Sequence, residues 1–231
     1  MDGAMNENNK KIMRFGRVTI LLSLLTLVSA SLTIIFDLNE SEVGLYTFKP
    51  ISTILIIIIA VLANKPPSNR YKRAIIAGLI FSLIGDVVLI LPGDVFLIGL
   101  VSFLIAHLFY IAAFVMVGGF YRTFWGTIPF LLVGIVLGIV LWPDLGDMKS
   151  PVLAYMIIIL IMAWQALGQW RQTGEIRALL AFLGAILFVI SDLALAVNRF
   201  ATPIDMAALL VLGTYYPAQW LIALSAGQEH P

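Results

Sequence analysis

Two aspartates stand out because each lies inside a long apolar run of the chain. Asp86 occurs in Ile84-Gly-Asp-Val-Val-Leu89, and Asp192 occurs in Ile190-Ser-Asp-Leu-Ala-Leu195. An ionisable side chain at bilayer depth costs about 2.5–3.5 kcal/mol on insertion scales, so by default it is a functional candidate. We therefore predict that Asp86 and Asp192 carry the chemistry of this protein and that the rest of the chain brings them together.

Two buried carboxyls can serve as an acid and a base in one site. A carboxyl removed from water favours its neutral form, and a second carboxyl nearby favours that form further. One acid can then donate a proton at neutral pH while its ionised partner orients a water molecule. This arrangement suits general-acid cleavage of an acid-labile ether or acetal bond through an oxocarbenium-like cation. It suits a proton-coupled transporter of a small molecule or lipid equally well, so the residues leave both functions open.

Further polar side chains accompany the two aspartates at helical spacings. Residues three and four apart share one face of a helix. By this rule Ser82 lies one turn before Asp86, and His107 and Tyr110 lie on one face of the next apolar run. Tyr215 and Tyr216 each share a face with Gln219 near the C-terminus, and Ser191 directly precedes Asp192. We predict that these residues line the substrate site or relay protons: Ser82, His107, Tyr110, Ser191, Tyr215, Tyr216 and Gln219.

Two more candidates lie near the ends of apolar runs. Lys49 precedes Pro50, which suits the first turn of a helix because its missing N–H is not needed there. The ammonium of Lys49 can reach the lipid headgroups, or it can turn inward to a phosphate or an acid. Asn198 follows the apolar run that contains Asp192. We expect both residues near the outer face of the membrane.

The composition identifies an integral membrane protein. The chain has 231 residues, of which 61% are hydrophobic and 12% are charged, whereas a soluble domain carries about 25% charged residues. A helix needs about 20 apolar residues to span a bilayer. We predict an all-α bundle of eight transmembrane helices, with a single membrane domain over 15–225 and tails at 1–14 and 226–231. The predicted helices are 15–36, 47–63, 74–91, 95–117, 124–142, 151–169, 177–197 and 206–225.

The basic residues predict the orientation of this bundle. With eight helices, eleven of the fourteen Lys and Arg residues fall on one side of the membrane, and only Lys49, Lys149 and Arg199 fall on the other. Such a bias places the basic side in the cytoplasm, and with it both termini. The host membrane is either a bacterial cytoplasmic membrane or a eukaryotic endomembrane. Because topology accounts for the basic loops, we expect no nucleic-acid partner.

A short internal similarity suggests a duplication. The two aspartate segments match at an offset of 106 residues, and the same offset relates Tyr110 to Tyr216. If the chain consists of two parallel repeats of four helices, Asp86 and Asp192 face each other across a pseudo-twofold axis. A chance match in so apolar a chain is the alternative. Gly134 and Gly138 have the spacing of a GxxxG motif, which we assign to helix packing.

Several kinds of chemistry have no support in the sequence. The chain has no cysteine, so it has no disulfide, no thiolate nucleophile and no cysteine-based metal site. It also lacks a His-Glu-x-x-His pair, a P-loop, a dinucleotide fingerprint and a Gly-x-Ser-x-Gly nucleophile elbow. We therefore predict no cofactor and no metal ligands. The oligomeric state is not indicated.

The order of these motifs resembles the YhhN/TMEM86 family. The resemblance covers about residues 49–219 and most of the eight-helix layout. It rests on Lys49-Pro50, Gly85-Asp86, Phe96-x-x-Gly99-x-x-x-Phe103-x-x-x-His107-x-x-Tyr110, Ser191-Asp192 and Tyr215-Tyr216-Pro-x-Gln219.

The resemblance implies a lysoplasmalogenase, because the characterised animal members hydrolyse the vinyl-ether bond of lysoplasmalogens. The products are a fatty aldehyde and glycerophosphoethanolamine or glycerophosphocholine. On this reading one of Asp86 and Asp192 protonates the vinyl ether, and the other stabilises the cation and orients water. Lys49 or Asn198 meets the phosphate, and the lysophospholipid substrate enters sideways from the membrane lipids.

Overall fold

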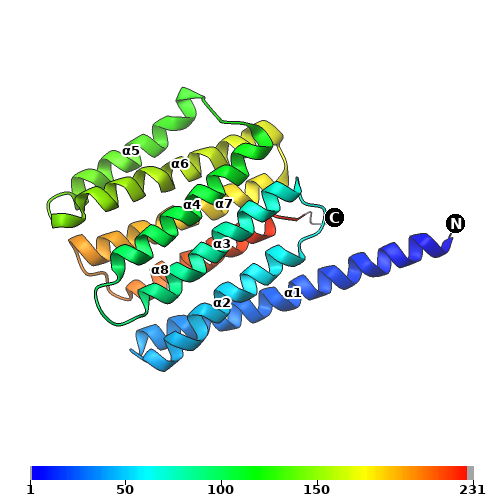
Figure 1. The fold of residues 1–231 in the computed structure, drawn as a ribbon, viewed down its shortest axis with the longest axis horizontal. Coiled ribbons are helices and arrows are strands. Elements are labelled where there is room, and N and C mark those ends of the chain that lie inside the picture. Colours follow the sequence, from blue (N-terminus) through cyan, green and yellow to red (C-terminus); the bar gives the residue numbers. More distant parts are fainter. Residues whose placement is uncertain (1, 228–231) are drawn as a thin grey trace.

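The computed structural model describes residues 2–227, which form an all-helical protein (Figure 1). Within that range the chain forms eight α-helices, together with a 3-10 turn η1 (Gly146–Met148) and a π-helical turn η2 (Val197–Ala201). The α-helices are α1 (Asp2–Leu38), α2 (Glu42–Leu62), α3 (Asn69–Leu89), α4 (Phe96–Gly118), α5 (Phe124–Leu141), α6 (Lys149–Thr173), α7 (Ile176–Ala196) and α8 (Ala207–Leu224).

Seven of these helices are long and apolar enough to cross a membrane. The chain is therefore a multi-pass membrane protein, as the composition predicts. The exception is α3, which begins with Arg70, Lys72 and Arg73 and contains Asp86. Its 21 residues span about 31 Å at 1.5 Å per residue, which is also the thickness of a bilayer core. The charged residues that distinguish α3 from the seven apolar helices thus lie in its first turn and at Asp86, one of the two candidate site aspartates.

Consecutive helices run up and down the bundle, and each packs on the next except α4, which packs on α6 instead of on α5. Figure 1 shows that α1 begins and α8 ends at the same end of the bundle. It also shows α5 at one edge, beside α6, and α1 with α2 at the opposite edge. The interior is formed where α3 and α4 pack together, α7 and α8 pack together, and α8 also contacts α2 and α3. This arrangement brings the two aspartate-bearing helices, α3 and α7, each into contact with α8.

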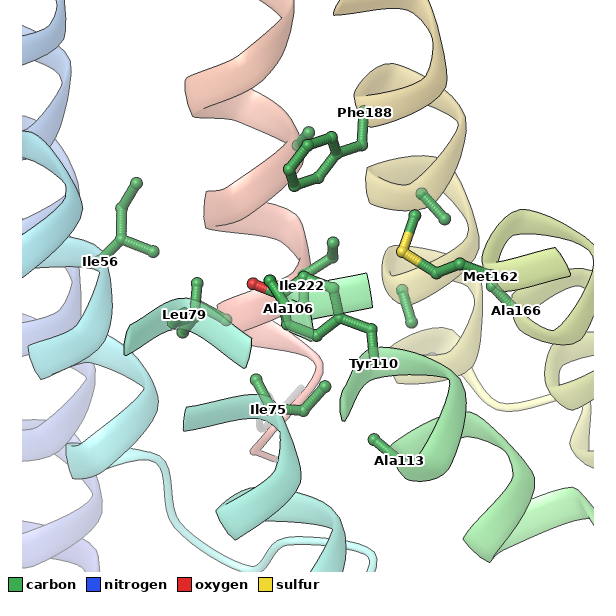
Figure 2. Packing of buried hydrophobic residues seen from close by; sticks show 14 of the residues in the cluster. Ile56, Ile75, Leu79, Ala106, Tyr110, Ala113, Met162, Ala166, Phe188 and Ile222 are labelled. Atoms are coloured by element: carbon green, nitrogen blue, oxygen red, sulfur yellow. The ribbon is translucent and has the colours of Figure 1, made fainter. Parts of the chain in front are cut away.

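Small residues allow the interior helices to approach closely. Figure 2 shows Tyr110 reaching from α4 toward the centre of the bundle, where it belongs to the same buried cluster as Leu79 and Ile222. Space for this ring exists because α3 carries Gly78 there, where an added Cβ would lie 2.3 Å from the Tyr110 ring. Gly85 likewise faces the ring of Phe103, at 2.6 Å from an added Cβ. Glycine in a membrane helix typically permits such contacts.

Two helix starts differ from the predicted ones. Helix α2 begins at Glu42 rather than at residue 47, because an acidic residue in the first turn complements the helix dipole. Pro50 therefore lies inside α2 and not in its first turn. It deprives the carbonyl of Tyr46 of its helical donor. Helix α1 continues from Phe15 back to Asp2, where a tail was predicted.

The remaining boundaries lie within five residues of those predicted. At the C-terminus Ala226 and Gly227 are buried against the bundle, and the rest of the predicted tail, with His230, lies outside the described residues. Of the GxxxG pair, Gly134 packs against Leu160 of α6, whereas an added Cβ on Gly138 would meet no atom within 4 Å. The packing prediction therefore holds for Gly134 and is wrong for Gly138.

Candidate active site

Asp86 is held by hydroxyl groups from two neighbouring helices. The residue is 1% exposed. The Thr53 hydroxyl of α2 donates to Oδ2 at 2.6 Å, and the Tyr215 hydroxyl of α8 donates to the same oxygen at 2.7 Å. A buried carboxyl needs such partners because no water competes for it there. Asp86 is thus fixed at the junction of α2, α3 and α8.

An amide connects this carboxyl to two further predicted site residues. Gln219 donates from Nε2 to the Tyr215 hydroxyl at 3.1 Å and accepts at Oε1 from the Tyr110 hydroxyl at 2.8 Å. The Tyr110 hydroxyl also lies 3.4 Å from the Ser82 hydroxyl. The four residues Ser82, Tyr110, Gln219 and Tyr215 therefore form one continuous hydrogen-bonded chain that ends on Asp86.

Asp192 has a different partner, which the sequence did not reveal. The Tyr155 hydroxyl of α6 donates to Oδ2 of Asp192. Unlike Asp86, Asp192 is only partly buried. The ring of His107 packs edge-on against Tyr155, with centroids 5.2 Å apart, and against Phe188 at 4.7 Å. His107 thus supports the tyrosine that holds Asp192.

Both carboxyls line one cavity of about 100 Å³. Tyr215, Tyr155 and Ser191 line it as well, and the rest of its wall is apolar apart from Lys49. A second cavity of about 500 Å³ adjoins it. The two share Lys49, Leu89, Leu195, Val211 and Leu212. We call them the acid cavity and the outer cavity.

The outer cavity is the more polar of the two. Asp37, Glu42, Tyr46 and Asn198 contribute to its wall together with Lys49. Lys49 lines both cavities, sharing the wall of the acid cavity with Asp86 and that of the outer cavity with Asp37. The side chain thus stands between a polar vestibule and the acid cavity.

Four of the predicted site residues are engaged elsewhere or have no polar partner. The Ser191 hydroxyl donates to the Val211 carbonyl at 2.9 Å, which ties α7 to α8. Asn198 Oδ1 accepts from the Ile204 amide at 2.8 Å and orders the connection to α8. Among the described residues, the two ring nitrogens of His107 and the hydroxyl of Tyr216 are buried without a hydrogen bond. Tyr216 lines a groove between α1 and α8 instead of the acid cavity.

Two contacts to the carboxyls come from residues that the sequence analysis missed. Thr53 and Tyr155 lie in apolar runs and belong to no motif. The available signal was weak: Thr53 lies three residues after Pro50, and Tyr155 lies four residues after Pro151 in the first two turns of α6. Over the part of the chain that the structure describes, no group of three or more His, Asp or Glu side chains is arranged to hold a metal ion.

The family model that matches this sequence decides its relationship. The model is described as the YhhN family and matches residues 45–226, which include every residue of the acid cavity. The chain belongs to the YhhN family. No solved structure matches it.

Curated relatives of the chain come from mammals and bacteria. It is 38% identical over 162 residues to lysoplasmalogenase TMEM86B of Homo sapiens, covering 69% of this chain and 66% of the relative. It is 38% identical over 157 residues to lysoplasmalogenase TMEM86A of Homo sapiens, covering 66% and 64%. It is 26% identical over 182 residues to membrane protein YhhN of Escherichia coli O157:H7, covering 78% and 86%. The match thus spans slightly less than two thirds of each human relative.

Proposed function

We propose that this YhhN-family protein is an intramembrane hydrolase that cleaves the vinyl-ether bond of lysoplasmalogens. The observation that carries the proposal is the pairing of two carboxyls, Asp86 and Asp192, in one largely apolar cavity within the membrane-spanning bundle. The names of the mammalian relatives add support, since they are lysoplasmalogenases. A vinyl ether needs strong acid in water, and a proton donor held beside it in a cavity of low polarity replaces that acid.

The hydrogen bonds suggest which carboxyl is the proton donor. Two hydroxyls donate to Asp86, whereas one donates to Asp192. Hydrogen bonds donated to a carboxylate favour its ionised form. We therefore assign Asp192 as the general acid and Asp86 as the carboxylate that stabilises the cation and activates water.

Together these two roles give a catalytic cycle that consumes one water molecule. Asp192 protonates the β-carbon of the vinyl ether, which leaves an oxocarbenium ion at the carbon bonded to oxygen. Water adds to that carbon, Asp86 takes the proton, and a hemiacetal results. Asp86 then protonates the glycerol oxygen while Asp192 accepts the hemiacetal hydroxyl proton. The C–O bond breaks, the fatty aldehyde and glycerophospho-alcohol leave, and both carboxyls regain their starting protonation states.

The outer cavity fits the headgroup of this substrate. Lys49 would pair with the phosphate, and the amide NH₂ of Asn198, whose oxygen is already bonded, would donate to it. Asp37 and Glu42 line the same cavity and would face the ammonium of an ethanolamine or choline group. A zwitterionic headgroup thus finds both signs of charge there, one step outward from the carboxyls.

We further propose that α3 crosses the membrane with the other seven helices and that both termini are cytoplasmic. The distribution of Lys and Arg residues supports this orientation. The loops at the end of the bundle that holds the outer cavity are then on the non-cytoplasmic side. The substrate would come from that leaflet.

The test compares two lipids and three proteins. Purified full-length protein in detergent is incubated with lysoplasmalogen and with its saturated alkyl-ether analogue, and released aldehyde is measured. We expect aldehyde from the vinyl ether alone, because a saturated ether cannot be protonated at carbon to give the oxocarbenium ion. Asp192→Asn and Asp86→Asn should each lower kcat by about 10² or more, the usual contribution of acid–base groups. Normal turnover in both variants would contradict the assignment.

The alternative is a proton-coupled transporter that uses the same two carboxyls. An enzyme works in detergent micelles without a gradient. A transporter needs sealed vesicles and responds to a pH difference across them. Folded wild-type protein that releases no aldehyde, but moves a lipid across proteoliposomes in response to a pH gradient, would replace the hydrolase proposal.

A further inference from the structure

A third, narrower cavity lies between α5, α6 and α7. Its volume is about 40 Å³, and its wall is apolar apart from Tyr155 and Asp192. Each of the three helices contributes at least one partly exposed residue to it, among them Leu137 of α5, Met156 of α6 and Leu193 of α7. This cavity therefore reaches the outside of the bundle at the level of Asp192. We call it the lateral cavity.

The lateral cavity adjoins the acid cavity. The two share Val152, Tyr155, Asp192 and Ala196. The carboxyl of Asp192 and the Tyr155 hydroxyl that bonds it thus lie at the junction of these two cavities. The acid cavity is on the side of the proposed headgroup, and the lateral cavity is on the opposite side. This position explains why Asp192 is partly exposed while Asp86 is 1% exposed.

A second lipid-facing groove has a weaker connection. It lies between α1 and α8, has a volume of about 570 Å³ and is lined by Leu27, Ser31 and Tyr216 among others. It shares only Leu212 with the acid cavity. Tyr215 and Tyr216 are adjacent in α8 but line the acid cavity and this groove respectively, so the helix itself separates the two.

We propose that the hydrocarbon chain of the substrate runs from the acid cavity through the lateral cavity, between α5 and the α6–α7 pair, into the bilayer. This inference rests on the proposed function, because it assumes a single-chain lipid whose headgroup lies in the outer cavity. The vinyl-ether carbons then lie at the junction, next to Asp192. The remaining methylenes pass Leu137 and Met156 to the lipid.

Helix α5 is suited to form one wall of such a passage. Only Phe130 and Leu141 of α5 are buried, whereas α4 buries eight residues. In Figure 1, α5 lies at the edge of the bundle beside α6. A helix with so few buried residues can shift outward at small cost in packing. Because the chain moves from lipid hydrocarbon into an apolar wall, the passage contributes little affinity and acts mainly by admitting or excluding long chains.

The first experiment narrows the passage and compares chain lengths. Met156→Trp, which adds bulk to the lateral cavity without touching the acid cavity, is compared with Leu27→Trp, which adds the same side chain to the α1–α8 groove. Each purified variant is given a lysoplasmalogen with a full-length alkenyl chain and an analogue whose vinyl-ether chain ends a few carbons beyond the double bond. We expect Met156→Trp to lower kcat/KM for the long chain by about tenfold or more, as an overpacked site does. The short-chain value should stay near that of the wild type.

The outcomes separate the proposals. Loss of long-chain turnover in Leu27→Trp and not in Met156→Trp would place the chain in the α1–α8 groove and overturn the inference. Equal long-chain turnover in Met156→Trp and wild type would also overturn it. Absence of aldehyde from both substrates with wild-type protein would contradict the proposed hydrolase activity. It would not contradict the proposed route of the hydrocarbon chain.

A second measurement tests the route without turnover. Wild-type protein is irradiated with a saturated 1-O-alkyl lysophospholipid that carries a diazirine midway along its chain, and the labelled peptides are identified. We expect labels on α5 and α6 near Leu137 and Met156. Labels confined to α1 and α8 would overturn the inference, whether or not Met156→Trp folds.

Discussion

Asp86 and Asp192 differ in the hydrogen bonds that hold them, although the sequence around each is similar. Thr53 and Tyr215 both donate to Asp86, and Tyr155 donates to Asp192. These differences are set by residues on other helices. The two halves of the pair can therefore have different protonation states within one cavity, which is what an acid and its partner require.

Tyr155→Phe tests the role of the single donor to Asp192. The substitution removes the hydroxyl and keeps the ring against which His107 packs. A hydrogen bond to a charged group contributes about 1.5–3 kcal/mol, so we expect kcat to fall roughly 10- to 100-fold with little change in thermal stability. Aldehyde release as a function of substrate concentration gives kcat and KM separately.

The matched control for this variant is Tyr121→Phe, in the connection between α4 and α5. Its backbone is held by Gln165 through two hydrogen bonds that do not involve the hydroxyl. We expect wild-type kinetics from it. If both tyrosine variants turned over at the wild-type rate, Tyr155 would have no part in setting the state of Asp192.

His107 shows the limit of interpreting a polar residue by type alone. Its spacing in α4 predicts a site residue, yet its nitrogens have no hydrogen-bond partner among the described residues and its ring lies between aromatic rings. An unpaired buried polar group costs about 1–3 kcal/mol. We propose that His107 acts through Tyr155 as a positioning residue rather than touching the substrate.

At the scale of the elements, glycines decide how closely α3 approaches α4. The ring of Tyr110, which belongs to the hydrogen-bonded chain that ends on Asp86, occupies the space that a side chain at position 78 would need. The same holds for Phe103 and Gly85 about two turns further along α3. The position of the site network therefore depends on this helix contact as well as on the polar side chains.

Gly78→Ala and Gly138→Ala form a matched pair that tests this dependence. An added Cβ at position 78 would lie 2.3 Å from the Tyr110 ring, whereas at position 138 it would meet nothing within 4 Å. We expect Gly78→Ala to destabilise the protein by about 1–3 kcal/mol through overpacking, and to lower turnover. Gly138→Ala should be neutral or stabilising by up to about 1 kcal/mol, because alanine favours the helix.

Thermal unfolding in detergent, followed by tryptophan fluorescence at one scan rate, measures the difference. A similar shift in both glycine variants would mean that helix propensity outweighs the α3–α4 contact. If Gly78→Ala lowers both the stability and the turnover and Gly138→Ala lowers neither, the α3–α4 contact is linked to the site.

At the scale of the whole molecule, the orientation in the membrane decides which leaflet supplies the substrate. The chain has no cysteine, so single cysteines can be introduced without removing others. Asp205→Cys lies in the exposed connection between α7 and α8, and Asn69→Cys lies at the exposed start of α3. We expect a membrane-impermeant maleimide to label Asp205→Cys in intact cells and Asn69→Cys only after permeabilisation.

The reverse labelling pattern would place both termini outside the cytoplasm and the outer cavity on the cytoplasmic side. Labelling of both cysteines in intact cells would contradict an α3 that crosses the membrane. The first result would leave the chemistry of Asp86 and Asp192 unchanged and alter only the side from which the substrate arrives.

The duplication suggested by the sequence stays a prediction at this scale. Packing of α3 on α4 and of α7 on α8 fits two equivalent halves. The related tyrosines differ, however, since Tyr110 bonds Gln219 while Tyr216 faces the groove beside α1 without a hydrogen bond. If a repeat exists, its second copy has lost this contact.

The sequence by itself determined the features that follow from local pattern. Continuous apolar runs predict the helices and the membrane location, because each helix must satisfy its own backbone in lipid. The cost of burying charge identifies Asp86 and Asp192, and the chain of residues from Ser82 to Gln219 could be named in advance because all are polar at depth.

Tertiary structure decided what each of these side chains contacts. Thr53 and Tyr155 were not foreseen because a hydroxyl in an apolar run can face lipid, bond its own helix or reach a neighbouring one, and the sequence does not distinguish these. The rotation of α8 similarly sends Tyr215 to Asp86 and its neighbour Tyr216 to α1. Hydrophobic patterning determines whether a helix spans the membrane. In a helix that is apolar all round, only packing against neighbouring helices determines which face contacts which partner.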